Sequence, residues 1–211
     1  MIITNTPQKT LAKAVELKGI GLHSGKAIDL VLRPAAADCG FVFVRTDLDP
    51  QVEIPALAQY VSKTDRGTTL SVEGVDVQTT EHVLAALVGC GINNCRIELN
   101  GAEVPILDGS SKPFVEAIQT AGIQDQEALQ EIFVVQENIH ITDEASGSEI
   151  LIVPAESTSL TVLIDFETKV LGTQNAVLHK MEDFPSEIAS SRTFSFLHEL
   201  ETLLEQNLIK G

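Results

Sequence analysis

Glu81 and His82 are adjacent in this sequence, and their side chains could act together on one ion or substrate. They close the stretch Gln78-Thr-Thr-Glu-His82, where a segment with helical spacing of apolar residues begins. Adjacent side chains on a helix project about 100° apart, so His82 could bind an ion while Glu81 stays just outside its ligand shell. The positive end of the helix dipole would keep the carboxylate ionised and able to accept a proton. One histidine is not a metal site, so a solvent-exposed helix cap is the alternative interpretation.

Two glycine-containing stretches are further candidates for binding. Gly19-Ile-Gly-Leu-His-Ser-Gly25 would let backbone approach a ligand with His23 as a polar contact, or it is simply a tight turn. The segment 105–111 contains Asp108, which is either a ligand or part of an Asx turn and helix cap. The other histidines are scattered and form no HExxH or HxH cluster: His140, His179 and His198.

The composition indicates a soluble, acidic, globular protein of the cytoplasm. Its 211 residues are 44% hydrophobic, enough for one large or two small domains. The net charge of −16 disfavours nucleic acid and anionic lipid as partners, so an anionic substrate would need a locally basic pocket. No apolar run approaches the roughly 18 to 20 residues of a membrane span, and no export signal opens the sequence. The cysteines have no CxxC pairing and are expected to be reduced thiols: Cys39, Cys90 and Cys95.

Strand signals in the first half predict the sheet. The β-rich runs Ile28–Leu32 and Phe41–Arg45 flank Pro34 and a turn, and they are expected to form a hairpin. Cys95–Leu99 is expected to be a buried strand. The pattern favours antiparallel hairpins over βαβ repeats.

Two helices are predicted in the same half. The first has a threonine cap at residue 79 or 80 and ends at Gly89 or Gly91. The second is capped by a serine at 110 or 111, has proline in its first turn, and stops at Gly122. The first half therefore consists of strands and a pair of helices.

An internal repeat suggests a duplicated domain. Leu30-Val-Leu-Arg-Pro-Ala35 resembles Ile150-Leu-Ile-Val-Pro-Ala155, and Val42-Phe-Val44 resembles Val162-Leu-Ile164, both 120 positions apart. We predict a first domain at 1–124 and a second at 129–211, separated by a polar linker over 122–130. The second unit is too short to repeat the last strand and second helix of the first. It is therefore expected to be incomplete, and the sequence to be a portion of something longer.

Five motifs taken together closely resemble one enzyme family, the UDP-3-O-acyl-N-acetylglucosamine deacetylases (LpxC-type). These are zinc amidases that commit a sugar nucleotide to lipid A synthesis. The resemblance runs from about Gln8 to Gly211 and keeps the family order. The motifs are Gly21-Leu-His-Ser-Gly25, Arg45-Thr-Asp47, Thr80-Glu-His-Val-Leu-Ala-Ala86, Glu103-Val-Pro-Ile-Leu-Asp-Gly-Ser110 and Ser191-Arg-Thr-Phe194.

The resemblance implies an α+β fold of two similar domains. Each would be an antiparallel-rich sheet with paired helices, the helices would pack at the domain interface, and the active site would lie in the cleft between the domains. By the resemblance, His82 is a Zn2+ ligand, Glu81 the general base, and Thr193 the hydrogen-bond donor to the oxyanion. The substrate, an acylated UDP-sugar, would contact three residues: Leu22, His23 and Phe194.

Some family features have no counterpart in this sequence. The other two zinc ligands, from a His-Lys-x-x-x-Asp helix, and the histidine that acts as catalytic acid are not found, so these 211 residues alone are expected to be inactive. The stretch Thr64-Asp-Arg-Gly-Thr-Thr69 lacks the cysteine that some members carry there. Two alternatives stay open: a bifunctional protein with a C-terminal hydroxyacyl-carrier-protein dehydratase domain, and a catalytically dead binding module.

Overall fold

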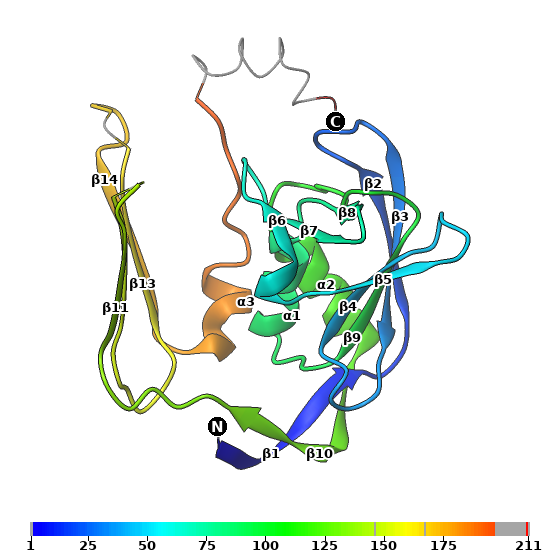
Figure 1. Ribbon diagram of the computed structural model, residues 1–211, viewed down its shortest axis with the longest axis horizontal. Helices are drawn as coiled ribbons and strands as arrows, with labels where there is room; N and C mark the ends of the chain where they lie inside the picture. The colour runs from blue at the N-terminus through cyan, green and yellow to red at the C-terminus, as the bar shows by residue number, and fades with distance from the viewer. Residues whose placement is uncertain (1, 146, 167, 197–209, 211) are drawn as a thin grey trace.

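The computed structural model describes residues 2–145, 147–166, 168–196 and 210, and a five-stranded mixed sheet forms its main body (Figure 1). The strand order is β2-β3-β9-β4-β5. β4 and β9 run parallel, whereas the other neighbouring pairs are antiparallel. The strands are β2 (Val15–Ile20), β3 (Ala27–Pro34), β4 (Phe41–Arg45), β5 (Val52–Pro55) and β9 (Cys95–Leu99).

The hairpin predicted between β3 and β4 is wrong, because β9 lies between these two strands. Ile97 of β9 pairs with Leu32 on one side and with Phe43 on the other. The connection from β3 to β4 covers residues 35–40, long enough to pass the roughly 10 Å taken up by one intervening strand. Phe43 and Val44 point to opposite faces and are both fully buried, as expected for a strand inside a sheet.

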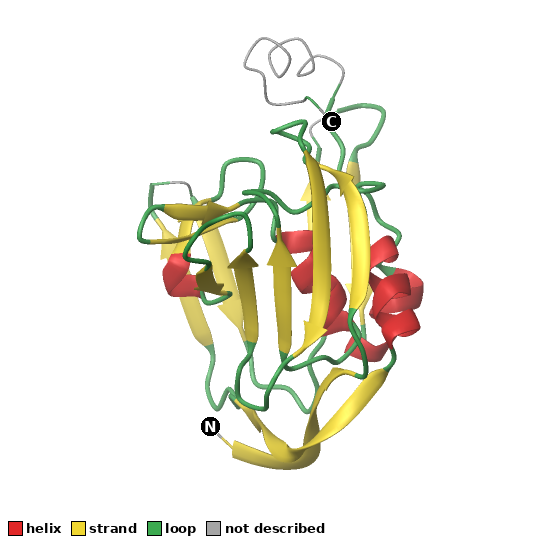
Figure 2. Cartoon of the chain, turned by 90° about the vertical axis from the view of Figure 1, so that its right-hand side faces the viewer, coloured by secondary structure: helices red, strands yellow, loops and turns green. Residues whose placement is uncertain are grey.

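Both predicted helices are confirmed, and they cover one face of the sheet. α1 (Glu81–Gly89) and α2 (Lys112–Ala121) pack against each other, and α2 also contacts β2. Figure 1 shows both helices on the side that faces the later hairpins, and Figure 2 shows the sheet strands in front of them. The core between sheet and helices includes fully buried side chains from both layers: Leu30, Phe43, Ile97, Leu87, Phe114 and Ile118.

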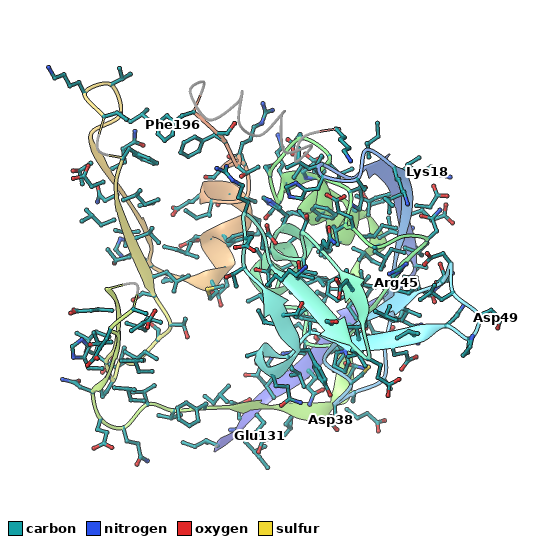
Figure 3. The ribbon with its side chains drawn as sticks, turned by 45° about the horizontal axis from the view of Figure 1, so that its top comes forward. Lys18, Asp38, Arg45, Asp49, Glu131 and Phe196 are labelled. Carbon is teal, nitrogen blue, oxygen red and sulfur yellow. The ribbon has the colours of Figure 1, made fainter. Side chains whose placement is uncertain are left out.

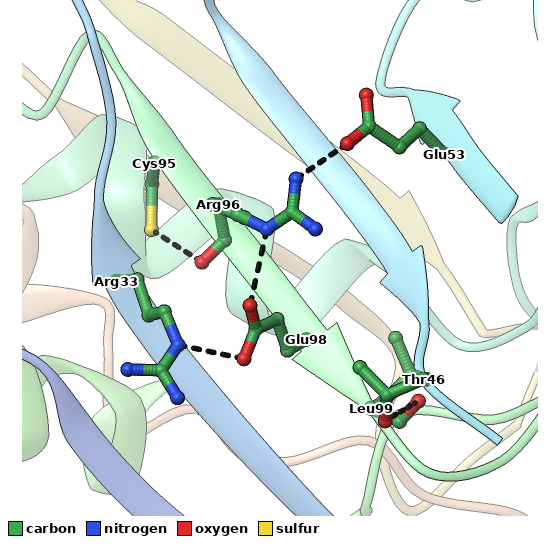
Figure 4. A network of polar contacts seen from close by, with 7 residues as sticks. All are labelled: Arg33, Thr46, Glu53, Cys95, Arg96, Glu98 and Leu99. Carbon is green, nitrogen blue, oxygen red and sulfur yellow. Dashed lines mark hydrogen bonds and ion pairs between the residues drawn. The ribbon is translucent and has the colours of Figure 1, made fainter. Parts of the chain in front are cut away.

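The outer face of the sheet carries a row of charges (Figure 4). Glu98 on β9 accepts hydrogen bonds from Arg33 Nε (2.6 Å) and Arg96 Nε (3.1 Å), and Arg96 also pairs with Glu53 on β5. Burial works to raise the pKa of Glu98, but the hydrogen bonds from Arg33 and Arg96 prevail and lower it. The hydrogen bond to Glu53 raises the pKa of Arg96. This row ties strands from β3 to β5 and is structural.

A small three-stranded sheet lies between β5 and α1 in the chain, and an arginine–aspartate pair joins it to the main sheet. The sheet consists of β6 (Val61–Lys63), β7 (Thr69–Val72) and β8 (Val75–Val77), preceded by the 3-10 turn η1 (Ala58–Tyr60). Arg45, at the end of β4, donates two hydrogen bonds to the Asp47 carboxylate and one to the Asp76 carbonyl, all 2.8 Å. The Arg45-Thr-Asp47 motif therefore fastens the small sheet to the main one.

The segment predicted as a polar linker forms a strand. β10 (Ile123–Ile132) pairs antiparallel with β1 (Ile2–Leu11). Its polar residues resemble a linker in the sequence, but in the structure their backbone pairs with β1 and some of their side chains make hydrogen bonds. Gln126 donates to the Ala35 carbonyl (3.0 Å) and accepts from Asn94 Nδ2 (2.8 Å). These contacts connect β10 to the main body.

Two antiparallel hairpins follow β10 and repeat the pairing seen in the first half. β11 (Ile139–Asp143) pairs with β12 (Ser148–Ile152), and β13 (Leu160–Asp165) pairs with β14 (Thr173–Leu178). The repeated sequence segments coincide with β3 and β12, and with β4 and β13. Among the described residues no strand lies between β12 and β13, whereas β9 lies between β3 and β4. The α+β class is observed, and the division into two similar domains stays a prediction.

A short helical segment returns the chain to α1. It comprises η2 (Met181–Asp183) and α3 (Phe184–Glu187), both of which contact α1. The Phe184 ring is 8% exposed and lies against Gly89, where a Cβ would overlap the ring. Further along, Leu197, Leu200, Leu203 and Leu204 are spaced as in a helix and predict one, but this segment lies outside the described residues. No helix in the described part of the chain is long and apolar enough to cross a membrane.

Candidate functional site

The start of α1 places Glu81 against a neighbouring loop. Glu81 Oε2 accepts a hydrogen bond from the Thr68 N–H (2.9 Å), and Thr80 Oγ1 donates to the Thr68 carbonyl (3.2 Å). Thr80 is the N-cap residue as predicted, but its hydroxyl makes no capping bond to the helix. Thr79 has a φ of 58°, an unusual left-handed backbone for a β-branched residue. The Thr68 N–H thus holds the Glu81 carboxylate, and the next residue, His82, is half-buried.

A pocket of about 660 Å³ opens beside this helix start. Its wall includes His23, the 63–67 loop, Thr69, Gln78 and Thr79. Lys63 and Arg66 bring positive charge to this loop, and Asp65 lies between them. A protein of net charge −16 therefore has a locally basic segment at this pocket. Thr79 is the last of these lining residues before α1, and Glu81 follows it two positions later.

The loop that carries His23 is a tight turn, as one of the two interpretations predicted. Gly25, with a φ of 66°, donates its N–H to the Gly21 carbonyl (2.9 Å). Because His23 also lines the pocket, the turn and the binding interpretation are compatible. Leu22 is half-buried, and its carbonyl accepts a hydrogen bond from the Lys210 N–H (2.9 Å).

Glu103 is a buried carboxylate at this site whose role the sequence analysis missed. It is 1% exposed and accepts the backbone N–H groups of His23 and Ser24, each at 2.9 Å. Thr79 Oγ1 lies 3.5 Å from the same carboxylate. A lone glutamate before a Val-Pro pair carries no pattern that indicates burial; only its place in a recognised motif drew attention to it.

The 105–111 segment forms the Asx turn that was one of the two alternatives predicted for Asp108. Asp108 Oδ1 accepts the N–H (3.0 Å) and the hydroxyl (2.7 Å) of Ser110, and Ser110 Oγ accepts the Lys112 N–H (3.1 Å). The hydrogen bond from the Ser110 hydroxyl lowers the pKa of Asp108, and the nearby Arg192 adds to this effect. Asp108 thus acts within an Asx turn at the start of α2.

The structure brings the Ser191–Phe194 motif to this same turn. The Thr193 N–H donates to the Gly109 carbonyl (2.9 Å), and Arg192 Nη2 lies 3.8 Å from Asp108 Oδ2. Two motifs more than 80 positions apart in the chain are therefore in contact. The predicted oxyanion role of the exposed Thr193 side chain stays a prediction.

Phe194 belongs to a cluster of three aromatic rings. Its ring is 58% exposed and makes edge-to-face contacts with Phe166 (5.4 Å between centroids) and Phe196 (5.5 Å). Figure 3 labels Phe196 on the side of the β13–β14 hairpin, whereas Arg45 lies within the main body. An exposed cluster of this kind suits contact with apolar groups.

The described residues supply only part of a metal donor set. His82 is the candidate ligand at the helix start, but no three His, Cys, Asp or Glu side chains gather into a metal-binding group within the described part of the chain. His140 pairs with Glu149 (3.6 Å) within the β11–β12 hairpin, and His179 follows β14. His198 lies outside the described residues. Burial raises the pKa of the Cys95 thiol to about 12, so it stays protonated.

The fold and site define an α+β protein in which a carboxylate–histidine pair opens a helix beside a polar pocket, an arrangement suited to acid–base or metal-assisted chemistry. A family model described as LpxC, UDP-3-O-acyl N-acetylglycosamine deacetylase, matches residues 8–211. The chain belongs to this family.

Curated relatives have matching names. UDP-3-O-acyl-N-acetylglucosamine deacetylase of Myxococcus xanthus is 46% identical over 205 residues, covering 97% of this chain and 65% of the relative. The protein of Hahella chejuensis with the same name is 42% identical, with 97% and 68% covered. A protein of Bacteroides thetaiotaomicron named bifunctional enzyme LpxC/FabZ is 43% identical, with 97% and 44% covered. The chain thus spans about half to two thirds of the length of these relatives.

Proposed function

We propose that this chain forms part of a hydrolase that removes the acetyl group from the acetamide of UDP-3-O-acyl-N-acetylglucosamine, the committed step of lipid A synthesis. Family membership supports this proposal. The observation that carries it is the Glu81–His82 pair at the start of α1, next to a pocket with a basic loop.

The proposed cofactor is Zn2+, for which His82 would supply one ligand. A catalytic zinc site needs three protein ligands, and the described residues do not gather three such side chains. The remaining ligands would have to come from elsewhere in the active protein. Zinc, when bound, lowers the pKa of its water to about 7 and polarises a carbonyl.

Glu81 would act as the general base. The Thr68 N–H donates a hydrogen bond of 2.9 Å to its carboxylate and fixes its orientation. An ionised, oriented carboxylate can accept the proton of an attacking water, an effect worth roughly 10²–10⁴ in rate. The hydrogen bond from the Thr68 N–H would therefore serve catalysis by holding the base in place.

Thr193 would stabilise the negative oxygen that forms when water attacks the amide. Its backbone is anchored by the Gly109 carbonyl, which restricts where the hydroxyl can lie. A fixed donor that meets charge only as it develops lowers the barrier without tightening substrate binding. Thr193 thus complements Glu81 from a different part of the chain.

The substrate would use both the charge and the apolar surface of this region. The pocket loop with Lys63 and Arg66 suits a diphosphate, and His23 lines the same pocket. Leu22 and the exposed Phe194 would contact less polar parts of the substrate. A basic loop in an otherwise acidic protein would draw an anionic substrate to this place.

Removal of His82 tests the metal part of this proposal. In the active protein that contains this chain, His82→Ala should abolish bound zinc and acetamide hydrolysis, because a three-ligand site cannot lose one ligand and keep its affinity. Zinc is measured by elemental analysis and hydrolysis by acetate release. His140→Ala, in the β11–β12 hairpin, is the matched control and should keep both. Full zinc content in the His82 variant would refute the assignment.

The bifunctional relatives suggest a second candidate. Proteins named LpxC/FabZ align with this chain over 44% of their length, so a polypeptide with a further dehydratase domain would also fit. Reading the residues encoded after Gly211 distinguishes the candidates.

A further inference from the structure

Glu103 stands out because it is a charged side chain that is almost completely buried and contacts residues of the pocket wall. Its residue is 1% exposed, and a carboxylate removed from water must have compensating hydrogen bonds. Both oxygens are used: Oε1 accepts the His23 N–H and Oε2 the Ser24 N–H, each at 2.9 Å. Charge-assisted bonds to two consecutive backbone N–H groups fix the loop in one conformation.

The fit between this carboxylate and the loop depends on Gly21. A Cβ at Gly21 would overlap the Glu103 carboxylate and the Ser24 hydroxyl. The loop backbone can approach Glu103 so closely only because residue 21 has no side chain. Gly21 and Glu103 therefore form a matched pair.

Glu103 is also joined to the segment that begins α1. It forms an isolated parallel bridge with Gln78, in which Gln78 N–H donates to the Ala102 carbonyl (2.9 Å) and Val104 N–H to the Gln78 carbonyl (3.0 Å). Thr79 Oγ1 reaches the Glu103 carboxylate at 3.5 Å. One residue thus contacts the His23 loop and the residues just before Glu81.

We propose that Glu103 is a positioning residue that sets where the His23 loop lies relative to the Glu81–His82 helix start. His23, Gln78 and Thr79 all line the pocket, so Glu103 connects two separate segments of its wall. Its effect on turnover rests on the proposed deacetylase function. Its effect on loop order does not.

Backbone amide hydrogen exchange tests the loop directly. In the unmodified chain, the His23 and Ser24 amides should be protected far more than amides of exposed turns such as that of Gly74, between β7 and β8. Exchange at the rate of an exposed turn would overturn the proposal without any variant. In Glu103→Gln one oxygen becomes an NH2 group that faces a backbone donor, so exchange at His23 and Ser24 should rise at least tenfold while Ile97 in β9 stays protected.

Glu98→Gln is the matched control, because Glu98 also bonds two donors but lies on the outer face of the sheet. It should leave loop exchange unchanged. An equal rise at the loop and at Ile97 in Glu103→Gln would show only general destabilisation and would refute a positioning role.

Kinetics of the active protein separate this inference from the proposed function. Glu103→Gln should raise KM for the UDP-sugar about tenfold, with little change in zinc content, since His23 would no longer be held at the pocket. An active enzyme whose KM is unchanged in this variant would overturn the positioning role. A different outcome is faster loop exchange in Glu103→Gln together with no deacetylase activity in the unmodified protein. That result would refute the proposed function and leave the loop role standing.

Discussion

Thr193 provides a test of catalysis at the scale of one side chain. Thr193→Val keeps the shape but removes the hydroxyl, so we expect kcat to fall roughly 10²–10³-fold with KM nearly unchanged. The reason is that a donor to the oxyanion is needed only as charge develops. Steady-state kinetics on the active protein measure both constants. Equal losses in kcat and in affinity would make Thr193 a substrate-binding residue.

The Arg45–Asp47 pair gives a prediction for pH. Hydrogen bonds from Arg45 lower the pKa of Asp47, so this pair stabilises the fold at pH values above the usual carboxyl pKa, and the stabilisation is lost as pH falls through the lowered value. Asp47→Asn should therefore reduce the free energy of unfolding by about 1–2 kcal/mol at pH 7. Urea unfolding at pH 7, 5 and 3 should show the difference shrinking toward pH 3. A difference that stays constant down to pH 3 would exclude this ionic origin.

The sequence alone identified the residues with recognisable chemistry, but it did not identify Glu103 as the residue that bonds the His23 loop. Glu81, His82 and His23 stand in motifs whose types indicate function, and the structure places His23 and the residues before Glu81 at one pocket. Glu103 is recognisable only once the chain brings it under the His23 loop, since burial of a single glutamate has no periodic signal. Contacts between distant segments therefore limit what residue types can reveal.

At the scale of elements, local signals were sufficient for the helices but not for strand order. The caps and glycine stops of α1 and α2 depend on neighbouring residues, and both helices form where predicted. Strand order depends on partners far along the chain. β9 enters between β3 and β4, and β10 pairs with β1, and neither partner can be inferred from nearby residues.

The open edges of β12 and β13 predict how the chain behaves in solution. Each pairs on one edge only among the described residues, and their apolar side chains are exposed, with Leu163 at 71%. Such edges promote association. Leu163→Lys should reduce aggregation of the purified chain, measured by light scattering during heating. Val170→Lys adds the same charge in the turn after β13, where Val170 is 92% exposed, and should help less. Equal effects would mean that net charge alone governs association.

At the scale of the whole molecule, two of the contacts made by the segment that follows β14 join it to the region of α1 and α2. Phe184 packs on α1 at Gly89, and the Thr193 backbone binds the Gly109 carbonyl at the start of α2. The first contact is made on α1 and the second in the turn that precedes α2. Thr193 is thereby held beside the half of the chain that carries Glu81. We infer that the proposed active site depends on this docking.

The most direct test of the account is Glu81→Gln in the active protein that contains this chain. The account assigns Glu81 to proton transfer and His82 to the metal, so the variant should keep full zinc content while deacetylation falls roughly 10²–10⁴-fold. Zinc stoichiometry and acetate release on the same preparation measure both. Loss of zinc together with activity would contradict the account, because Glu81 would then be a ligand, and unchanged activity would show that the base lies elsewhere.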